Sequence, residues 1–210
     1  MKFIVVEGNI GSGKTTFLKE IQQKYKNIIT IDEPVNEWYN IKDEKDDTLF
    51  EKFYKDAKAY GYLFQTNVLA TRFKKIMDTI HLYSEEDKII LCERSILTDK
   101  NIFVSAALEL GNLNKMEGDV FNNLYHICLS ATNMRVDSIL YLQCPPEISF
   151  ERIKKRNRKG EENVPFEYIK LLHNKHEDWL INKESQIPIH VIDNTIDSDF
   201  ESIYSFLTNL

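Results

Sequence analysis

Residues 8–16 read GNIGSGKTT, and they follow the apolar run Phe3-Ile4-Val5-Val6 close to the N-terminus. The stretch matches the pattern G-x-x-x-x-G-K-[ST] at four positions, Gly8, Gly13, Lys14 and Thr15. In this pattern the glycines let backbone N–H groups turn inward around phosphate oxygens, the lysine reaches the terminal phosphates, and the hydroxyl holds Mg²⁺. The stretch therefore predicts binding of a nucleoside triphosphate.

The residues on either side of this loop predict the strand and the helix that the motif requires. Residues 3–6 are typical of a short buried strand, and Phe17, Leu18 and Ile21 form the apolar face of a helix. The N-terminus of that helix adds positive dipole to the phosphate site. A glycine-rich turn that matches by accident lacks these flanks, so we expect a genuine phosphate-binding loop.

Length and composition exclude several classes of protein. At 210 residues the chain is long enough for one domain with a sizeable core, and we expect a single domain over residues 1–210. The formal net charge of −6 argues against a general nucleic-acid binder. Three widely spaced cysteines favour a reducing, intracellular location. With no secretory signal and no stretch of transmembrane length, we expect a soluble protein of the cytoplasm or an organelle, without a membrane partner.

Apolar runs and helical patterns alternate along the chain. Strands are predicted at residues 3–6, 28–31, 89–92, 136–142 and 187–192. Helices are predicted over 48–83 with a break near Tyr60-Gly61, and then over 97–110, 116–133, from Pro145, over 165–183 and from Asp199. This alternation predicts an α/β fold with a five-stranded parallel sheet and helices on both faces.

The ends of three predicted strands carry the residue types that phosphoryl transfer needs. Glu33 follows the second strand and Glu93-Arg94 the third, so both meet the phosphate-binding loop at the carboxyl edge of the sheet. Transfer needs cations, Mg²⁺ and a carboxylate that orients or deprotonates the attacking hydroxyl. We expect Lys14 and Arg94 as the cations, Thr15 and Glu93 beside Mg²⁺, and Glu33 as the base. The alternatives are an exposed strand-end acid for Glu33 and a helix-cap acid for Glu93.

One face of the long middle helix is polar where a core face would be apolar. Gln65, Val68 and Arg72 are spaced i, i+3 and i+7 and so share that face. A solvated surface explains this spacing equally well. The other interpretation is a nucleobase site, because Gln and Arg can read the hydrogen-bonding edge of a base and aromatic side chains nearby can hold a flat ring, namely Trp38, Tyr54 and Phe64.

Residues 152–159 form a basic cluster that has three interpretations: a nucleic-acid patch, a solvated helix face, or a mobile lid over a triphosphate. The acidic net charge weakens the first. Arg152 and Arg156 at i, i+4, followed by Gly160 and the break before Pro165, favour an Arg-rich lid over about residues 152–164.

Six ordered segments together resemble the deoxynucleoside kinases, in particular the deoxycytidine and deoxyguanosine kinase group. They are GNIGSGKTT (8–16), EPVNEW (33–38), FQTNVLATR (64–72), ERSILTDKNIF (93–103), RIKKRNRKGEENVPFEY (152–168) and LHNKHEDWL (172–180). The resemblance covers nearly the whole chain. It implies a P-loop kinase fold and an enzyme that transfers the γ-phosphate of ATP to the 5′-hydroxyl of a deoxynucleoside, with Mg²⁺.

The resemblance also implies roles for individual residues. Glu33 would be the base on the 5′-hydroxyl, Arg94 would hold that hydroxyl and the phosphate, and Gln65 would read the nucleobase. Tyr54 and Glu161 would hold the 3′-hydroxyl. The ATP site would comprise Gly8, Asn9, Gly11, Ser12, Gly13, Lys14, Thr15, Thr16 and the lid residues Arg152, Arg156 and Arg158. The metal side would comprise Thr15 and Glu93, and the apolar walls Ile10, Val35, Trp38, Phe64 and Phe103.

Arg72 and Asp99 decide the expected base preference. In the family, this charged pair goes with deoxycytidine or purine deoxynucleosides, so thymidine is disfavoured. Val68 is bulkier than the alanine typical of deoxycytidine kinases and tilts the expectation towards purines. Gly160 stands where an acidic lid residue is common, and the C-terminal segment does not align with the part that contacts the adenine of the donor.

Other functions fit less well. A GTP-binding switch would need D-x-x-G and N-K-x-D motifs, which are missing. A non-catalytic structural relative would be expected to lose Lys14, Glu33 or Arg94, but this chain has all three. A nucleoside monophosphate kinase is the nearest alternative, but a charged acceptor calls for additional cations near the hydroxyl site. The helices over 97–110 and 116–133 carry more apolar residues than a monomer surface needs, and we expect a homodimer.

Overall fold

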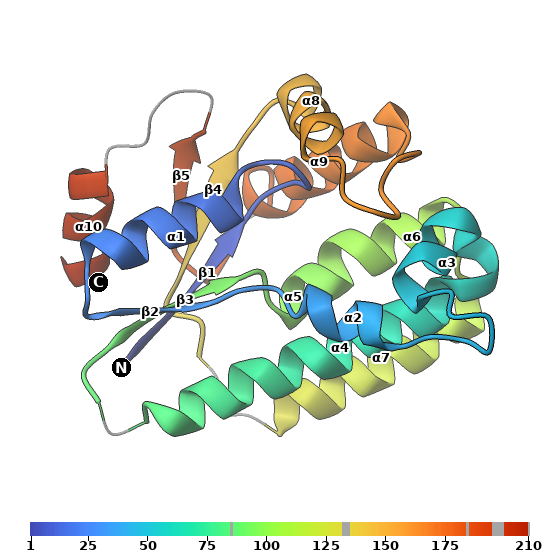
Figure 1. The fold of residues 1–210 in the computed structure, drawn as a ribbon. Helices are drawn as coiled ribbons and strands as arrows, with labels where there is room; N and C mark the ends of the chain where they lie inside the picture. Colours follow the sequence, from blue (N-terminus) through green and yellow to red (C-terminus); the bar gives the residue numbers. More distant parts are fainter. Residues whose placement is uncertain (85, 132–134, 184, 195–199, 210) are drawn as a thin grey trace.

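The computed structural model describes residues 1–84, 86–131, 135–183, 185–194 and 200–209. Five parallel strands form one sheet in the order β2-β3-β1-β4-β5 (Figure 1). Their bounds are Lys2–Glu7 for β1, Ile28–Ile31 for β2, Ile89–Glu93 for β3, Ser138–Gln143 for β4 and Ile189–Asp193 for β5. This arrangement confirms the predicted α/β fold. Because β1 is central, the loop that follows it emerges in the middle of the carboxyl edge.

Helices cover both faces of the sheet (Figure 1). On one face, α1 (Lys14–Lys24) and α10 (Phe200–Asn209) bury Phe17, Ile21 and Leu207 against alternate strand residues. On the other face, α4 (Ala57–Leu82) and α9 (Phe166–Leu180) bury Ile76 and Leu180 against the intervening ones. Strands buried on both sides explain the continuous apolar runs of the sequence.

The remaining helices lie around the carboxyl edge of the sheet, except Lys115–Ser130, which packs alongside α4 (Figure 1). They are α2 (Val35–Asn40), α3 (Leu49–Lys55), α5 (Ile96–Thr98), the π-helical segment Asp99–Val104, α6 (Ser105–Glu109), α7 (Lys115–Ser130) and α8 (Pro146–Arg156). The stretch predicted as one helix over 97–110 is thus interrupted by a π-helical segment. No helix among the described residues is long and apolar enough to cross a membrane.

One expectation about helix boundaries is wrong, and one short helix was not predicted. The break in the stretch 48–83 falls at Asp56, not near Tyr60-Gly61, because the Asp56 side chain accepts a hydrogen bond from Ala59 N and caps α4. Gly61 lies inside α4, where a Cβ would come within 3.0 Å of a Leu113 methyl group, so close packing explains this glycine. Helix α2 was not predicted, since its six residues are too few to show a helical apolar period.

Candidate active site

The phosphate-binding loop connects β1 to α1. Gly8, Gly11 and Gly13 have φ values of 147°, 79° and 94°, in the region that favours glycine, and a Cβ on Gly8 would meet the Leu142 carbonyl oxygen at 2.8 Å. The Ser12 hydroxyl is buried and has no hydrogen-bond partner among the described residues. Such a loop, with a free hydroxyl and glycine backbone, fits an anionic ligand.

Lys14 is buried at the start of α1. Its Nζ atom donates to the carbonyl oxygens of Gly8, at 3.0 Å, and Asn9, at 2.8 Å. Burial, with the neighbouring Arg94 charge, lowers the pKa of Lys14 to about 7. An anion at this position would favour the charged form of the lysine.

Thr15 and Glu93 bring a hydroxyl and a carboxylate together at the ends of α1 and β3. Thr15 Oγ1 donates to Glu93 Oε2 at 2.9 Å. Burial and the charge of Glu33 raise the pKa of Glu93. Ser95, not Glu93, caps α5, so the helix-cap interpretation of Glu93 is wrong.

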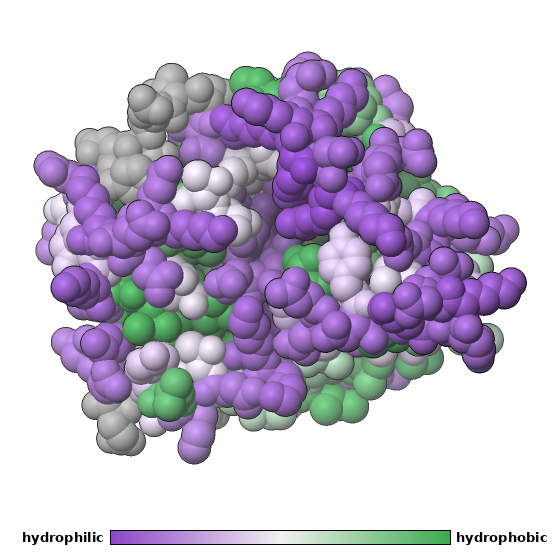
Figure 2. All heavy atoms as spheres, viewed as in Figure 1, coloured by the Kyte–Doolittle hydropathy of each residue, from purple (hydrophilic) through white to green (hydrophobic). Residues whose placement is uncertain are grey.

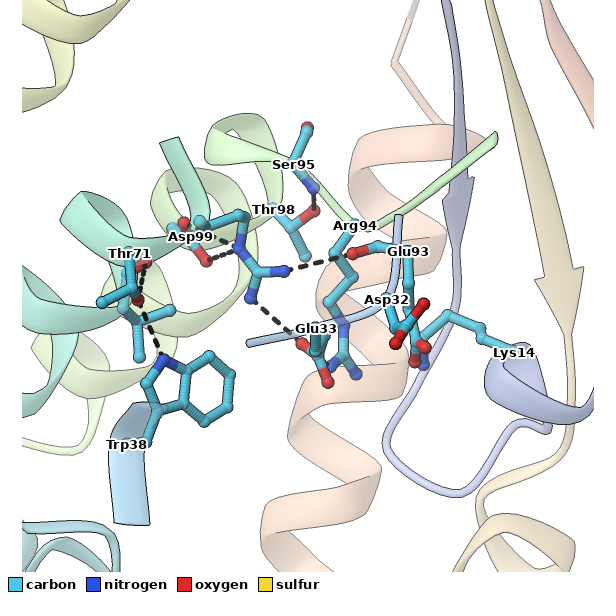
Figure 3. Close-up of polar contacts among 12 residues, drawn as sticks. Lys14, Asp32, Glu33, Trp38, Thr71, Glu93, Arg94, Ser95, Thr98 and Asp99 are labelled. Carbon is cyan, nitrogen blue, oxygen red and sulfur yellow. Dashed lines mark hydrogen bonds and ion pairs between the residues drawn. The ribbon is translucent and has the colours of Figure 1, made fainter. Parts of the chain in front are cut away.

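Glu33 lies between two arginines. Its Oε1 atom accepts hydrogen bonds from Arg94 Nη1 at 2.6 Å and from Arg72 Nη2 at 3.0 Å (Figure 3). Although burial raises it, the two guanidinium groups hold the pKa of Glu33 well below its ordinary value. The Glu33 side chain is 12% exposed, so the interpretation as an exposed strand-end acid is wrong.

Arg72 links Glu33 to Asp99. Arg72 Nε donates to both carboxylate oxygens of Asp99 at 3.1 Å, and Arg72 Nη1 donates to the Glu93 carbonyl oxygen at 3.1 Å (Figure 3). Burial raises the pKa of Asp99 to about 6, even though Arg72 lowers it. Both side chains are almost fully buried. The structure therefore joins the strand ends to the helix face that the sequence assigned to a nucleobase.

That helix face lines a narrow cavity of about 60 Å³. Gln65, Val68 and Arg72 all lie on its wall, so the solvated-face interpretation is wrong. The Gln65 Oε1 atom is buried without a hydrogen-bond partner among the described residues. Further predicted residues on the wall are Ile10, Glu33, Trp38, Tyr54, Phe64, Arg94, Phe103 and Glu161.

Two predicted substrate residues lie off this wall. Val35 packs against the aromatic cluster around Trp38, and Asp99 reaches the cavity through Arg72. Three aromatic residues on the wall were not predicted, namely Phe50, Phe53 and Tyr168. Phe50 and Phe53 fall at helical spacing beside Tyr54, which is a signal of helix packing as much as of a binding wall.

A second, wider groove of about 730 Å³ runs along the phosphate-binding loop. The predicted residues that line it are Gly11, Gly13, Lys14, Thr15, Thr16, Glu93, Arg152, Arg156 and Arg158. Gly8, Asn9 and Ser12 do not line the groove; they are buried residues of the loop itself. The residues common to both spaces are Gly11, Lys14, Thr15, Glu93, Arg156 and Arg158. In Figure 2 this face is hollowed near its centre, with strongly hydrophilic residues at the border.

The basic segment closes over both spaces. Arg156 and Arg158 form ion pairs with the buried Glu161 at 2.5 and 3.4 Å, and Arg152 Nη1 donates to the Ser12 carbonyl oxygen at 3.3 Å. Asn194, which was not predicted, also donates to that oxygen from the end of β5. These contacts place the cations over the groove, which fits the lid interpretation better than a nucleic-acid patch.

The tip of this segment rests on α2 and α3. Tyr39 Oη donates to the Lys159 carbonyl oxygen at 2.6 Å, and Lys159 Nζ lies 2.7 Å from Glu51 Oε1. Gly160 has a φ of 93°, and a Cβ there would lie 3.1 Å from the Phe50 ring. A glycine in place of an acidic residue therefore has a structural reason, because only glycine fits this close approach without strain.

Comparisons with known proteins identify the family of this chain. Residues 4–207 match the deoxynucleoside kinase family. The chain is 31% identical to a probable deoxycytidine kinase of Fowlpox virus, over 100% of this chain and 89% of the relative. It is 30% identical to the mitochondrial deoxyguanosine kinase of Xenopus laevis, over 96% of this chain and 84% of the relative. It is 34% identical to the mitochondrial thymidine kinase 2 of Macaca fascicularis, over 89% of this chain and 66% of the relative. The chain therefore belongs to the deoxynucleoside kinase family, whose members are phosphotransferases that act on deoxynucleosides.

Proposed function

We propose that this enzyme transfers the γ-phosphoryl group of ATP to the 5′-hydroxyl of a deoxynucleoside, with deoxycytidine or a purine deoxynucleoside preferred over thymidine. One observation carries the proposal: Glu33 and Arg94 stand beside Lys14 and Glu93, where the cavity and the groove meet. A nucleoside in the cavity would direct its hydroxyl towards a triphosphate in the groove.

The chemistry divides among the residues at this junction. Glu33 accepts the proton of the 5′-hydroxyl while the hydroxyl oxygen bonds to the γ-phosphorus and the bond to the β,γ-bridging oxygen breaks. Because its pKa is held low, Glu33 is a weak base, and orienting the hydroxyl is the larger part of its role. Arg94, Lys14 and the lid arginines, Arg152, Arg156 and Arg158, balance the charge of the phosphoryl group.

The donor set fits Mg²⁺. Thr15 and Glu93 offer oxygen atoms next to each other at the edge of the groove, and oxygen ligands are those that Mg²⁺ prefers. Two protein ligands would suffice, because Mg²⁺ usually takes its other ligands from phosphates and water. When bound, the ion supplies charge neutralisation and alignment of the phosphates.

The cavity supports the base preference. Gln65 presents an unpaired amide oxygen, and the Arg72–Asp99 pair adds buried charge at the wall. A site with such groups rejects a base that leaves them unpaired. Relatives named for deoxycytidine and deoxyguanosine share nearly the whole length, which also supports this preference. Tyr54 and Glu161 remain our candidates for the 3′-hydroxyl.

We further propose a homodimer in a reducing compartment, with residues 1–210 as one domain and residues 152–164 as its lid. On α7, Met116 and Ile127 are 75% and 65% exposed, and Leu108, Leu110 and Val120 lie exposed nearby in the sequence. Apolar surface of this kind is typical of an interface. Sedimentation that gives a monomer mass at all concentrations would contradict the dimer. Cys92, Cys128 and Cys144 are free thiols, as a reducing compartment would require.

The test is a phosphoryl-transfer assay with ATP and each of deoxyadenosine, deoxyguanosine, deoxycytidine and thymidine, with and without Mg²⁺. We expect Mg²⁺-dependent formation of the 5′-monophosphate, with one of the first three as best substrate. Thymidine as the best substrate would contradict the base preference alone. Turnover of no deoxynucleoside would contradict the reaction.

A further inference from the structure

Glu7 is a buried carboxyl group that the proposed reaction does not use directly. It is the last residue of the central strand β1, is fully buried, and lines neither the cavity nor the groove. Burial of a carboxyl group is unfavourable unless hydrogen bonds compensate for it. Its Oε2 atom has no partner within the described part of the chain. Stability alone therefore gives no reason to keep an acid here.

The other oxygen of Glu7 contacts Thr98. Thr98 Oγ1 donates to Glu7 Oε1, and the same hydroxyl accepts a hydrogen bond from Ser95 N at 3.0 Å (Figure 3 draws the second bond). Thr98 N also donates to the Ser95 carbonyl oxygen at 3.0 Å. Glu7, Thr98 and Ser95 are all fully buried. This chain of hydrogen bonds fixes the first turn of α5 to the end of β1.

The turn held in this way begins at Arg94. Arg94 has a φ of 63°, a left-handed conformation that is strained for a residue other than glycine. Three consecutive residues at the end of β1 hold it. Arg94 N donates to the Val6 carbonyl oxygen at 3.0 Å, Glu7 holds Thr98, and Arg94 Nη2 donates to the Gly8 carbonyl oxygen at 3.3 Å. The strained backbone aims Arg94 Nη1 at Glu33, 2.6 Å away.

We propose that Glu7 is a positioning residue for phosphoryl transfer: through Thr98 it fixes the turn of residues 94–98 and so places the Arg94 guanidinium beside Glu33. The inference rests on the proposed function, because the placed group matters only if a hydroxyl and a phosphoryl group meet there. Glu7 itself touches neither substrate.

A purely structural role for Glu7 predicts a different result. If Glu7 only stabilised the fold, its loss would lower the melting temperature and leave kcat per folded enzyme unchanged. If it positions Arg94, kcat falls, since a displaced guanidinium weakens an interaction made in the transition state. The Km for ATP would change little, because Arg94 does not line the donor groove.

The experiment removes the Thr98 hydroxyl, which lies in the middle of the chain of hydrogen bonds. Thr98→Val keeps the size of the side chain, and we expect it to lower kcat by at least about tenfold with the Km for ATP within about twofold of wild type. Thr98→Ser restores the hydroxyl and should keep kcat within about threefold. Ser138→Ala is the matched control, because Ser138 is also fully buried and loses one hydrogen bond, to the Pro188 carbonyl oxygen.

Variants of Glu7 complete a double-mutant cycle with Thr98. Glu7→Gln still accepts the Thr98 hydroxyl and should retain most of kcat, whereas Glu7→Leu should fall as far as Thr98→Val. Glu7→Leu and Thr98→Val break the same chain of hydrogen bonds. The double variant Glu7→Leu/Thr98→Val should therefore be no slower than either single variant. Unchanged kcat in Thr98→Val, an equal loss in Ser138→Ala, or multiplied losses in the double variant would overturn the inference. If Glu7→Leu does not fold, the two Thr98 variants decide.

Wild-type turnover is measured first, so that the two proposals fail separately. If the wild type phosphorylates a deoxynucleoside, the kcat ratios of the variants judge the role of Glu7. If it does not, the proposed function has failed, and a crystal structure of Thr98→Val judges the positioning. A displaced Arg94 side chain supports the inference, and an unmoved one overturns it.

Discussion

Arg72 donates to Glu33 Oε1 at 3.0 Å with one nitrogen and to both oxygens of Asp99 at 3.1 Å with another. One buried guanidinium therefore connects the carboxylate assigned to the acceptor hydroxyl with the acid assigned to the nucleobase. A change on either side of Arg72 alters the electrostatics of the other, because buried charges interact strongly at this distance.

Replacing Arg72 tests this connection. We expect Arg72→Met to raise the Km of the preferred nucleoside and to lower kcat, each by about tenfold or more. Asp99 would lose its guanidinium partner, and Glu33 would lose one of its two guanidinium partners. Steady-state kinetics on all four deoxynucleosides measures both effects. A change confined to Km would show that Arg72 serves binding alone. Lys75→Met on the same helix is the control, because Lys75 is partly exposed and its ammonium group contacts Asp32.

Gly160 should resist substitution. Gly160→Ala places a Cβ 3.1 Å from the Phe50 ring at a φ of 93°, so the tip of the lid must lift or strain. We expect the Km for ATP to rise by about three- to tenfold, because the lid arginines would sit less well over the groove. Gly111→Ala isolates the effect of the backbone, since Gly111 also has positive φ, at 69°, but no atom within 4 Å of the added Cβ. Equal Km values for the two variants would argue against lid seating.

His176 should make stability depend on pH. Burial lowers the pKa of this fully buried ring to about 3, while the unfolded value is near 6.5. Between these values the unfolded chain binds a proton that the folded chain does not. The free energy of unfolding therefore falls with decreasing pH, by about 1.4 kcal/mol per pH unit from this group. Its stabilising contribution is complete above about pH 6.5.

The measurement compares urea unfolding of wild type and His176→Phe from pH 4.5 to 7.5. Phenylalanine keeps an aromatic ring against Tyr141, on which His176 stacks, and does not titrate. We expect the difference in unfolding free energy between the two proteins to change with pH below 6.5 and to be constant above it. Parallel curves throughout would contradict the assignment of a low pKa.

Much of the fold follows from local sequence, and the exceptions have physical causes. Parallel strands covered on both faces need continuous apolar runs, so all five could be predicted, and Glu33 and Glu93 were found because they follow such runs. Glu7 was missed because a single acid at the end of an apolar run looks like the end of the strand. Its burial depends on Thr98, which is 91 positions away in sequence.

The cavity wall could be predicted only in part. Phe50 and Phe53 carry the spacing of an amphipathic helix, and that spacing does not distinguish a residue facing the core from one facing a ligand. Tyr168 comes from α9 and Asn194 from the end of β5, so only the packing of distant elements brings them to the site. The helix break was misplaced because glycine is a weaker signal than an aspartate cap.

The most direct test of the account is the Glu33→Gln variant, which keeps the size of the side chain and removes its charge. Asp32→Asn is the matched control, because Asp32 is the adjacent acid and its side chain is 68% exposed. We expect Glu33→Gln to lower kcat by about a hundredfold or more while calorimetry still detects nucleoside binding, and Asp32→Asn to behave as wild type. Turnover of Glu33→Gln within about threefold of wild type would contradict the assignment of Glu33 as the group that prepares the hydroxyl.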